Sequence, residues 1–436
     1  MSSDIGSTLS SRDPDSLLEH LQHLMESGPG TPVGQALELF LRCTERVRVA
    51  LPGSDSGETL ARSSEAGMAV RRFLDQDRKA GFATANLCDI GHYLKALRNA
   101  DQDPVPVDAG LGPAGPDRER SGSSPWLDTG REEGPGEAEL SSWLADAVDQ
   151  VEAAAGRITP IRVKQGWVES GRTAEAILTS RGLRAGRSRA RTWAALQVVS
   201  EGGGELFHRP RLLVGERAGG LPDVEPVLER LQAFPFFHKE AGLTPGAPLV
   251  FLPEAAATLI QAVVTLFHGA GERTGEPVGR GWCLTDDPHR LEMPFGGQFD
   301  DTGRGSQVLK LADGAHSLAT LGEEGHGWRR SFRDPPQRSF SNLVVAETGE
   351  TRPEHGFLVS ELRILRLSPK RFLAVAHGNS LEDGTPAADG GRIRFTFNPW
   401  RIPARIRGTC GRSRNTALGV ATPELVLESG KSVHFV

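Results

Sequence analysis

His268 and Glu272, near the middle of the chain, have side chains and a spacing that could bind a metal ion. Residues four apart share a face of an α-helix, so a helix continuing through both would bring an imidazole and a carboxylate together. Gly269 and Gly271 lie between them, and glycine is typical of a helix end, where a histidine can cap the last carbonyl groups. The sequence leaves two interpretations open: a metal pair and a solvated helix end.

Pairs of carboxylates occur at two further places. Asp286 and Asp287 precede a proline, and Asp300 and Asp301 precede a Thr-Gly step. Two neighbouring carboxyl groups could act as general acid and general base. Aspartate beside proline or glycine more commonly accepts hydrogen bonds from nearby backbone in an Asx turn. A catalytic dyad and a structural turn are therefore alternatives at both places.

Cys410 is the remaining candidate, in the segment Gly-Thr-Cys-Gly, whose glycines would let a ligand or another backbone approach closely. A lone thiol is otherwise a small buried apolar group. The four cysteines lie far apart and form no Cys-x-x-Cys pair. This spacing argues against a disulfide framework and a structural zinc site, and it favours a reducing cytoplasm.

Composition and missing motifs exclude several classes of function. The chain lacks a Gly-x-Gly-x-x-Gly motif after a strand, a P-loop, a Gly-x-Ser-x-Gly motif and a His-Glu-x-x-His helix. Its formal net charge is −6 and it has no long basic tract, so we expect no nucleic-acid partner. No stretch of about 18 apolar residues occurs and the first residues lack a signal-peptide pattern, so we expect a cytoplasmic protein without a membrane segment.

The first half of the chain predicts a mixture of helices and strands. Asp13 before Pro14 is typical of a helix N-terminus, and leucines at helical spacing follow until Gly28. Residues 35–49 are a second candidate helix with a less regular period, which leaves a strand at its end as an alternative. The other expected helices are 89–99, 143–155 and 224–234, and the expected strands are 67–74, 81–84, 158–167, 174–178 and 190–199.

The second half predicts many short strands around one apolar helix, residues 255–267. Residues 101–142 are rich in proline, glycine, serine and charge, which is typical of a loop or linker. We therefore expect an N-terminal domain in two parts, 1–100 and 143–244, joined by this linker, and a β-rich domain over 245–436. The expected strands of the second domain are 248–252, 282–285, 307–311, 343–346, 357–367, 372–377, 392–397 and 404–407.

Several short motifs resemble, in their order, those of the TldD/TldE (PmbA) metalloprotease family. In the N-terminal half, the segments 67–71 and 81–84 are similar to a family hairpin. The motifs of the C-terminal half lie at 250–253, before the Ala-rich helix, and at 284–288, 298–303, 340–343, 357–362 and 408–411. The resemblance implies an α+β fold, with an N-terminal α/β domain followed by a β-rich domain of antiparallel-sheet or barrel-like form.

The resemblance also implies that a TldD-type protein pairs with a TldE-type one. In the TldD type, the apolar helix carries His-Glu-x-x-x-His, the two histidines and a later cysteine hold zinc, and the glutamate activates water. Counted from the proline that opens the helix, these positions fall here on Gln261, Ala262 and Leu266, and only Cys410 is retained. If His268 is instead aligned with the first histidine of the motif, the glutamate position still holds no glutamate. One thiolate cannot hold a catalytic zinc, which typically needs three protein ligands.

The chain is thus similar to a TldE-type subunit that does not hydrolyse peptides. We expect no cofactor in this chain, and zinc in a TldD-like partner that cleaves peptides or a peptide-like natural-product intermediate. Asn342 lies in a matching motif and could position a peptide, the alternative being a structural hydrogen bond. A second class of function is an autonomous amide hydrolase or tailoring enzyme, with a non-standard site around His268, Glu272, Asp286, Asp287 and Cys410. A binding protein without a partner is a third.

Overall fold

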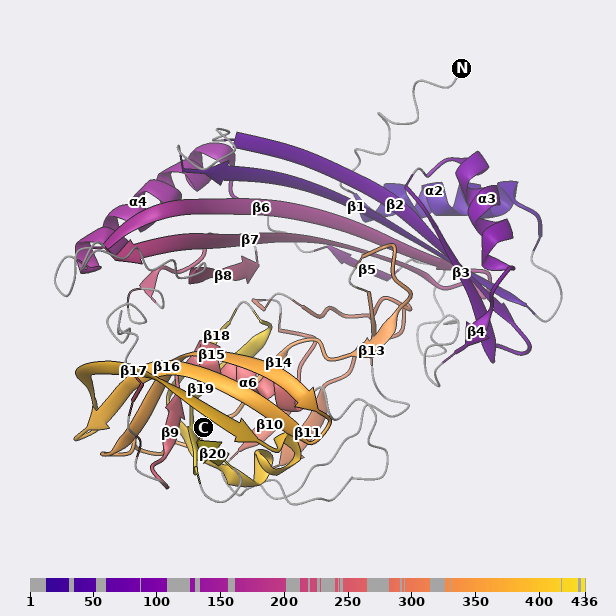
Figure 1. Ribbon diagram of the computed structural model, residues 1–436. Coiled ribbons are helices and arrows are strands. Elements are labelled where there is room, and N and C mark those ends of the chain that lie inside the picture. Colours follow the sequence, from indigo (N-terminus) through magenta and orange to yellow (C-terminus); the bar gives the residue numbers. More distant parts are fainter. Residues whose placement is uncertain are drawn as a thin grey trace.

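The computed structural model shows two large sheets, one from each half of the chain, facing each other (Figure 1). Helices lie on the outer face of the first sheet, and one helix packs inside the second half. The structure describes residues 13–30, 35–51, 60–86, 88–107, 126–129, 134–155, 161–200, 212–218, 220–225, 228, 240–241, 243, 246–264, 282–290, 292–293, 295–313, 326–329, 331–416, 418–429 and 433–435.

The N-terminal sheet has eight described strands in the order β4-β3-β2-β1-β6-β7-β5, with β8 also paired to β7. All its pairings are antiparallel except that of β5 with β7. Its long central strands arch over the second half of the chain (Figure 1). The strands are β1 (Ala36–Ala50), β2 (Leu60–Leu74), β3 (Lys79–Ala85), β4 (Val105–Pro106), β5 (Trp126–Thr129), β6 (Ile161–Thr179), β7 (Arg184–Ser200) and β8 (Leu212–Ala218).

The predicted helix over residues 35–49 is wrong, because these residues form strand β1 between β2 and β6. Residues 36–41 are all buried. Leu39 faces the outer helices, whereas Phe40 packs with Phe299 and Phe332 from the second half. A strand covered on both faces loses its polar–apolar alternation, so its sequence cannot be told from a buried helix. The described residues 161–167 of the expected strand 158–167, and the expected strand 174–178, are parts of the single strand β6.

The predicted helices near the N-terminus are confirmed as α2 (Pro14–Ser27) and α3 (Ile90–Ala100). The Asp13 carboxylate accepts hydrogen bonds from the first backbone N–H groups of α2, as expected for an N-cap. Leucines on one side of α2 pack with Tyr93 of α3 and with the outer face of the sheet. These helices close that face, so the opposite face is left for the second half of the chain.

Helix α4 (Glu137–Ala155) begins earlier than the predicted residue 143. The carboxylate of Glu139 accepts a hydrogen bond from the Gly136 N–H at 2.8 Å, which fixes this start. Strands β4 and β5 also lie within the stretch 101–142, so the described parts of the predicted linker contain secondary structure. Most of the predicted helix 224–234 falls outside the described residues.

The second sheet has ten described strands in the order β11-β10-β14-β19-β9-β15-β16-β17-β20, with β18 paired to β19. Two pairings, β14 with β19 and β9 with β15, are parallel and the others antiparallel. A separate ribbon joins β12 (His326–Trp328) and β13 (Gln337–Ser339). The sheet strands are β9 (Leu249–Phe251), β10 (Cys283–Asp286), β11 (Leu309–Asp313), β14 (Leu343–Val345), β15 (Gly356–Ser368), β16 (Arg371–Glu382), β17 (Thr385–Phe397), β18 (Ile406–Asn415), β19 (Val420–Leu427) and β20 (Val433–Phe435).

Helix α6 (Pro253–Val264) is the described part of the predicted apolar helix. It packs on one face of the second sheet, against Leu249 and Phe251 of β9 and their neighbours. Val250 points to the other face and packs with Leu358 and Cys410, because successive side chains of a strand alternate between faces. The two faces of this sheet therefore have separate cores.

The described part of the chain has a mixed α+β fold with mostly antiparallel sheets, as the sequence predicted. In the portions of the chain that the structure describes, no helix is long and apolar enough to span a membrane.

Candidate functional site

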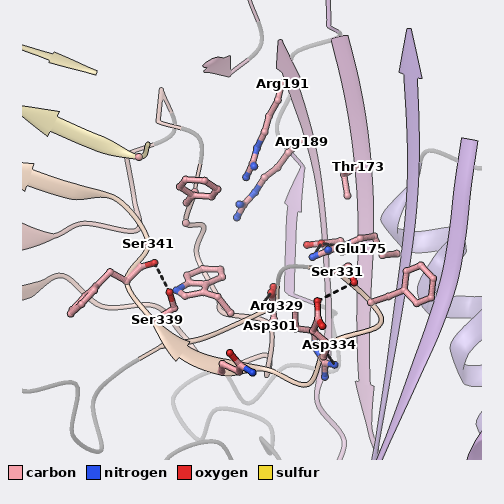
Figure 2. A pocket seen from close by; sticks show the side chains of 18 of the residues that line it. Thr173, Glu175, Arg189, Arg191, Asp301, Arg329, Ser331, Asp334, Ser339 and Ser341 are labelled. Carbon is pink, nitrogen blue, oxygen red and sulfur yellow. Dashed lines mark hydrogen bonds and ion pairs between the residues drawn. The ribbon is translucent and has the colours of Figure 1, made fainter. Parts of the chain in front are cut away.

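A cavity of about 1440 Å³ lies between the concave face of the N-terminal sheet and the near end of the second half. Its first wall comes from β1, β6 and β7, and the facing wall from the end of α6, the ribbon β12–β13 and the segments around residues 295–301 and 418–419. Figure 2 shows Arg189 and Arg191 pointing from β7 into this space, with Ser339 and Ser341 across it.

The wall is built by strict alternation along three strands. On β1 the even-numbered residues Arg42, Thr44 and Arg46 line the cavity, whereas Leu39 and Leu41 pack under the helices. On β7 the odd-numbered residues line it: Arg187, Arg189, Arg191 and Trp193. The antiparallel register through β6 places Thr173 and Glu175 between these two rows. The period of two therefore collects five arginines on one concave surface.

Glu175 is the buried centre of this wall. Its carboxylate accepts hydrogen bonds from Arg42 and Arg187, one on each neighbouring strand. Burial disfavours the charged carboxylate, but Arg187 and Arg42 outweigh it and hold the pKa of Glu175 well below its usual range. Glu175 is thus an anion that organises two cations within the sheet.

Arg187 also ties the wall to the second half of the chain. Its guanidinium donates to the Asp301 carboxylate and, at 2.9 Å, to the Phe299 carbonyl oxygen. Burial disfavours this cation, but Asp301 and Glu175 raise its pKa. A second connection runs from Glu38, which accepts from Arg71 at 2.6 Å and from Arg329 at 2.7 Å. These buried ion pairs fix the two halves against each other around the cavity.

Asp300 and Asp301 are neighbours with different roles. Asp300 accepts from the Thr302 N–H and hydroxyl at 2.9 and 2.6 Å and from the Gly327 N–H at 2.7 Å, which supports the Asx-turn interpretation for Asp300. Asp301 accepts from Arg187 and from the Arg329 N–H. Both carboxylates are almost fully buried, and Asp301 serves an ion pair between distant segments.

Asp286 and Asp287 point to different partners. Asp286 is fully buried and accepts from the Ser341 N–H at 2.9 Å and from the Ser341 hydroxyl at 2.5 Å, while its other oxygen has no hydrogen-bond partner among the residues that the structure describes. Burial raises the pKa of Asp286 to about 6, against the lowering effect of Ser341. Asp287 accepts from the His289 N–H at 3.0 Å, as in an Asx turn.

Asn342 is fully buried and holds the chain that leads to Phe295. Its carbonyl oxygen accepts from the Phe295 N–H at 2.9 Å, and its amide donates to the carbonyl oxygens of Phe295 and Arg290. Its described contacts are thus within the protein, as in the structural alternative. Phe295 lines the cavity, so Asn342 shapes that wall from behind.

Of the helix positions that the family resemblance assigns to zinc chemistry, the structure describes Gln261 and Ala262. Gln261 lines the cavity, and its amide donates to the Leu418 carbonyl oxygen at 2.6 Å. Ala262 is half-buried and packs against the core of the second half. Leu266, His268 and Glu272 fall outside the described residues, so their arrangement is not described. Gln261 is engaged in a structural hydrogen bond, and neither it nor Ala262 is a zinc ligand type.

Cys410 lies on the other face of the sheet from α6, packed with Val250, Leu358 and Val426. Its thiol donates to the Glu424 carboxylate at 3.3 Å. Burial, with the nearby Glu424, raises the pKa of Cys410 to about 12. A buried, protonated thiol on the far face does not join Gln261 in a zinc site. Across the described ranges, no three His, Cys, Asp or Glu side chains are grouped to hold a metal ion.

We call the cavity face that carries Arg42, Arg46, Arg187, Arg189 and Arg191 the arginine wall. It is the part of the site that the sequence did not predict. The signal was the alternation of Arg187, Arg189 and Arg191. The predicted strand began only at residue 190, so this alternation was not recognised as one face of a strand. Strand β1, which is separated from β7 by β6, coincides with the predicted helix 35–49, and a helix has a different periodicity from a strand.

Solved structures with the same architecture extend over almost the whole chain. TldE from Thermococcus kodakarensis superimposes with a TM-score of 0.71 at 16% identity, covering 97% of this chain and 99% of that one. A putative modulator of DNA gyrase from Bacteroides thetaiotaomicron gives 0.72 at 16% identity, covering 96% and 97%. A putative modulator of a DNA gyrase from Thermotoga maritima gives 0.67 at 13% identity, covering 96% and 99%. No protein-family model and no curated protein sequence matches the chain.

These similarities define the class of fold. The chain has a TldE/PmbA-like α+β fold along nearly its full length, which confirms, for the fold, the resemblance inferred from the sequence motifs. At 13–16% identity the likeness concerns architecture, and activity must be argued from the site itself.

Proposed function

We propose that this chain is the non-hydrolytic, TldE-like subunit of a heterodimeric zinc metalloprotease. It shapes a peptide chamber and supports a TldD-like partner, which supplies the zinc and cleaves peptides or a peptide-like natural-product intermediate in the cytoplasm. The observation that carries the proposal is helix α6, which places Gln261 at the cavity and Ala262 beside it. An amide and a methyl group cannot replace a zinc-binding imidazole and a water-activating carboxylate.

The surroundings of α6 support the same conclusion. Gln261 donates its amide to the Leu418 carbonyl oxygen, so the position of the missing ligand contributes to folding. Cys410, the one retained family position, is buried on the far face of the sheet with a raised pKa. The cavity itself is large and many of its lining side chains are polar or charged, which suits the holding of an extended peptide.

Reconstitution tests the proposal. The chain is co-expressed with a protein from its own locus that carries His-Glu-x-x-x-His, and the two are purified through a tag on this chain alone. We expect a stoichiometric complex that cleaves a peptide library, and no cleavage by this chain without the partner. Glutamine in place of the partner's motif glutamate should abolish cleavage, whereas Q261A in this chain should retain it. Proteolysis by this chain alone would contradict the proposal.

The same preparation distinguishes the proposed role from the alternative of an autonomous enzyme. An enzyme with its own site near His268 and Cys410 should be active without any partner and should lose activity in H268A. Activity that depends on the partner and is unchanged in H268A excludes that alternative.

A further inference from the structure

We propose that the arginine wall of the cavity binds an acidic peptide, with carboxylate side chains at alternate positions. This inference deepens the proposed function, on which it rests for the identity of the ligand as a peptide. It follows from three observations: the charge of the lining, the spacing of the guanidinium groups and the contacts of the neighbouring aromatic rings.

The described lining has more cations than anions. Seven arginines line the cavity, against the carboxylates of Glu65, Glu175, Asp301 and Asp334. Glu175 serves both Arg42 and Arg187, and it also lies within the electrostatic influence of Arg189. A concave surface with excess positive charge attracts anions, and Arg binds carboxylates in a two-pronged geometry. The seven are Arg42, Arg46, Arg187, Arg189, Arg191, Arg329 and Arg338.

The spacing of the cations matches an extended chain. Arg189 and Arg191 are half-buried, stand two residues apart on β7 and point into the cavity (Figure 2). Two residues of a strand span about 6.6 Å, which is also the separation of alternate side chains in an extended peptide. A peptide lying along β7 would therefore present a Glu-x-Glu or Asp-x-Asp pattern to these two side chains. The cavity, at about 1440 Å³, exceeds the usual small-molecule pocket of about 300–1,000 Å³.

The aromatic contacts argue against a single-stranded nucleic acid as the ligand. Such ligands need ring faces on which bases stack. Here three of the lining rings each have a guanidinium group over them: Arg191 lies 5.3 Å from the ring centre of Phe295, Arg46 lies 6.0 Å from that of Trp193, and Arg187 lies 5.5 Å from that of Trp328. The net charge of −6 on the whole chain also opposes nucleic acid.

Fluorescence anisotropy of the full-length chain tests the inference with short, labelled Gly/Ser peptides. One peptide carries glutamates at alternate positions, a second carries glutamines there, and a third carries the same glutamates next to one another. We expect the alternating glutamate peptide to bind at least about ten-fold more tightly than the glutamine peptide, since one charge-assisted hydrogen bond can account for that factor. The adjacent arrangement should bind more weakly than the alternating one.

The double variant R189Q/R191Q should lose this preference for glutamate, and its thermal unfolding curve should match that of the wild-type chain. The matched control R366Q/R371Q alters two exposed arginines of β15 and β16 and should bind as the wild type does. Equal binding of glutamate and glutamine peptides, or full binding by R189Q/R191Q, overturns the inference. Tighter binding of a single-stranded oligonucleotide than of the glutamate peptide, lost in R189Q/R191Q, also overturns it, because it identifies a general polyanion site.

The test of the acidic-peptide inference and the test of the proposed function can fail independently. Binding is measured on this chain alone, whereas proteolysis is measured on the reconstituted complex. An active complex with no glutamate preference rejects the acidic-peptide inference only. Glutamate-dependent binding by a chain that also cleaves peptides alone rejects the non-hydrolytic role only.

Discussion

At the scale of single residues, two buried carboxylates differ because their neighbours differ. Glu175 has two arginine partners and its pKa is lowered, whereas Asp286 accepts hydrogen bonds from Ser341 and its pKa is raised to about 6 by burial. The first is a permanent charge of the wall. The second takes up a proton in mildly acidic solution and so makes folding depend on pH.

Asp286→Asn tests this difference. Between the ordinary pKa of 3.8 and the folded value of about 6, the folded chain binds a proton that the unfolded chain does not, so this group weakens folding as pH rises, by up to about 1.4 kcal/mol per pH unit. Asparagine has no such titration. The stability of D286N relative to the wild type should therefore increase from pH 4 to pH 6, measured by urea unfolding. A difference that is constant with pH would contradict the assignment.

Cys410 gives a second residue-level prediction. With a pKa of about 12, its thiol should react with iodoacetamide at pH 8 on the order of a thousand-fold more slowly than a free cysteine. Mass spectrometry of labelled peptides, with the urea-unfolded chain as the control, measures the rate. Rapid labelling in the folded chain would instead indicate an accessible thiolate and would revive a role for Cys410 in chemistry.

At the scale of elements, the site depends on strands β1, β6 and β7, whose alternation places arginines on one face and apolar residues on the other. Glu175 on the middle strand joins the two outer rows. Because removing one member of a buried ion pair leaves the other charge uncompensated, the wall should be sensitive to that one carboxylate.

Glu175→Gln should therefore lower the free energy of unfolding by about 3–5 kcal/mol, since two arginines lose their shared anion. The matched control Glu361→Gln removes the partner of the exposed Arg363 and should cost less than about 1 kcal/mol. Urea unfolding at pH 7 measures both. Equal effects of the two substitutions would show that the buried cluster does not stabilise the wall.

The sequence predicted some elements well, and the reasons are local. Helix α2 has its N-cap, its proline and its leucine spacing within one short segment, and α6 is equally self-contained. Strand β1 was missed because its burial depends on Phe299 and Phe332, which are far away in the sequence. The arginine wall was missed for the same reason, since it exists only when β1, β6 and β7 are aligned.

At the scale of the whole molecule, the cavity lies between the two halves, and ion pairs that cross between the halves hold them together. Glu38 pairs with Arg329, and Arg187 pairs with Asp301. No local pattern connects residues so distant in the chain, so sequence reasoning treated Asp301 as part of a possible dyad. The order of the short motifs did predict the overall α+β architecture. Each motif lies within one half of the chain, so it can be read without knowing the contacts between the halves.

The proposed division of roles between two subunits depends on where the zinc is bound. The most direct measurement is the zinc content of this chain purified alone, of the proposed TldD-like partner purified alone and of their complex, by mass spectrometry of the metal after dialysis against zinc. We predict no stoichiometric zinc in this chain, and one zinc per heterodimer that is lost when the partner's motif histidines are replaced. One zinc per molecule of this chain alone, accompanied by peptide cleavage, would contradict the account.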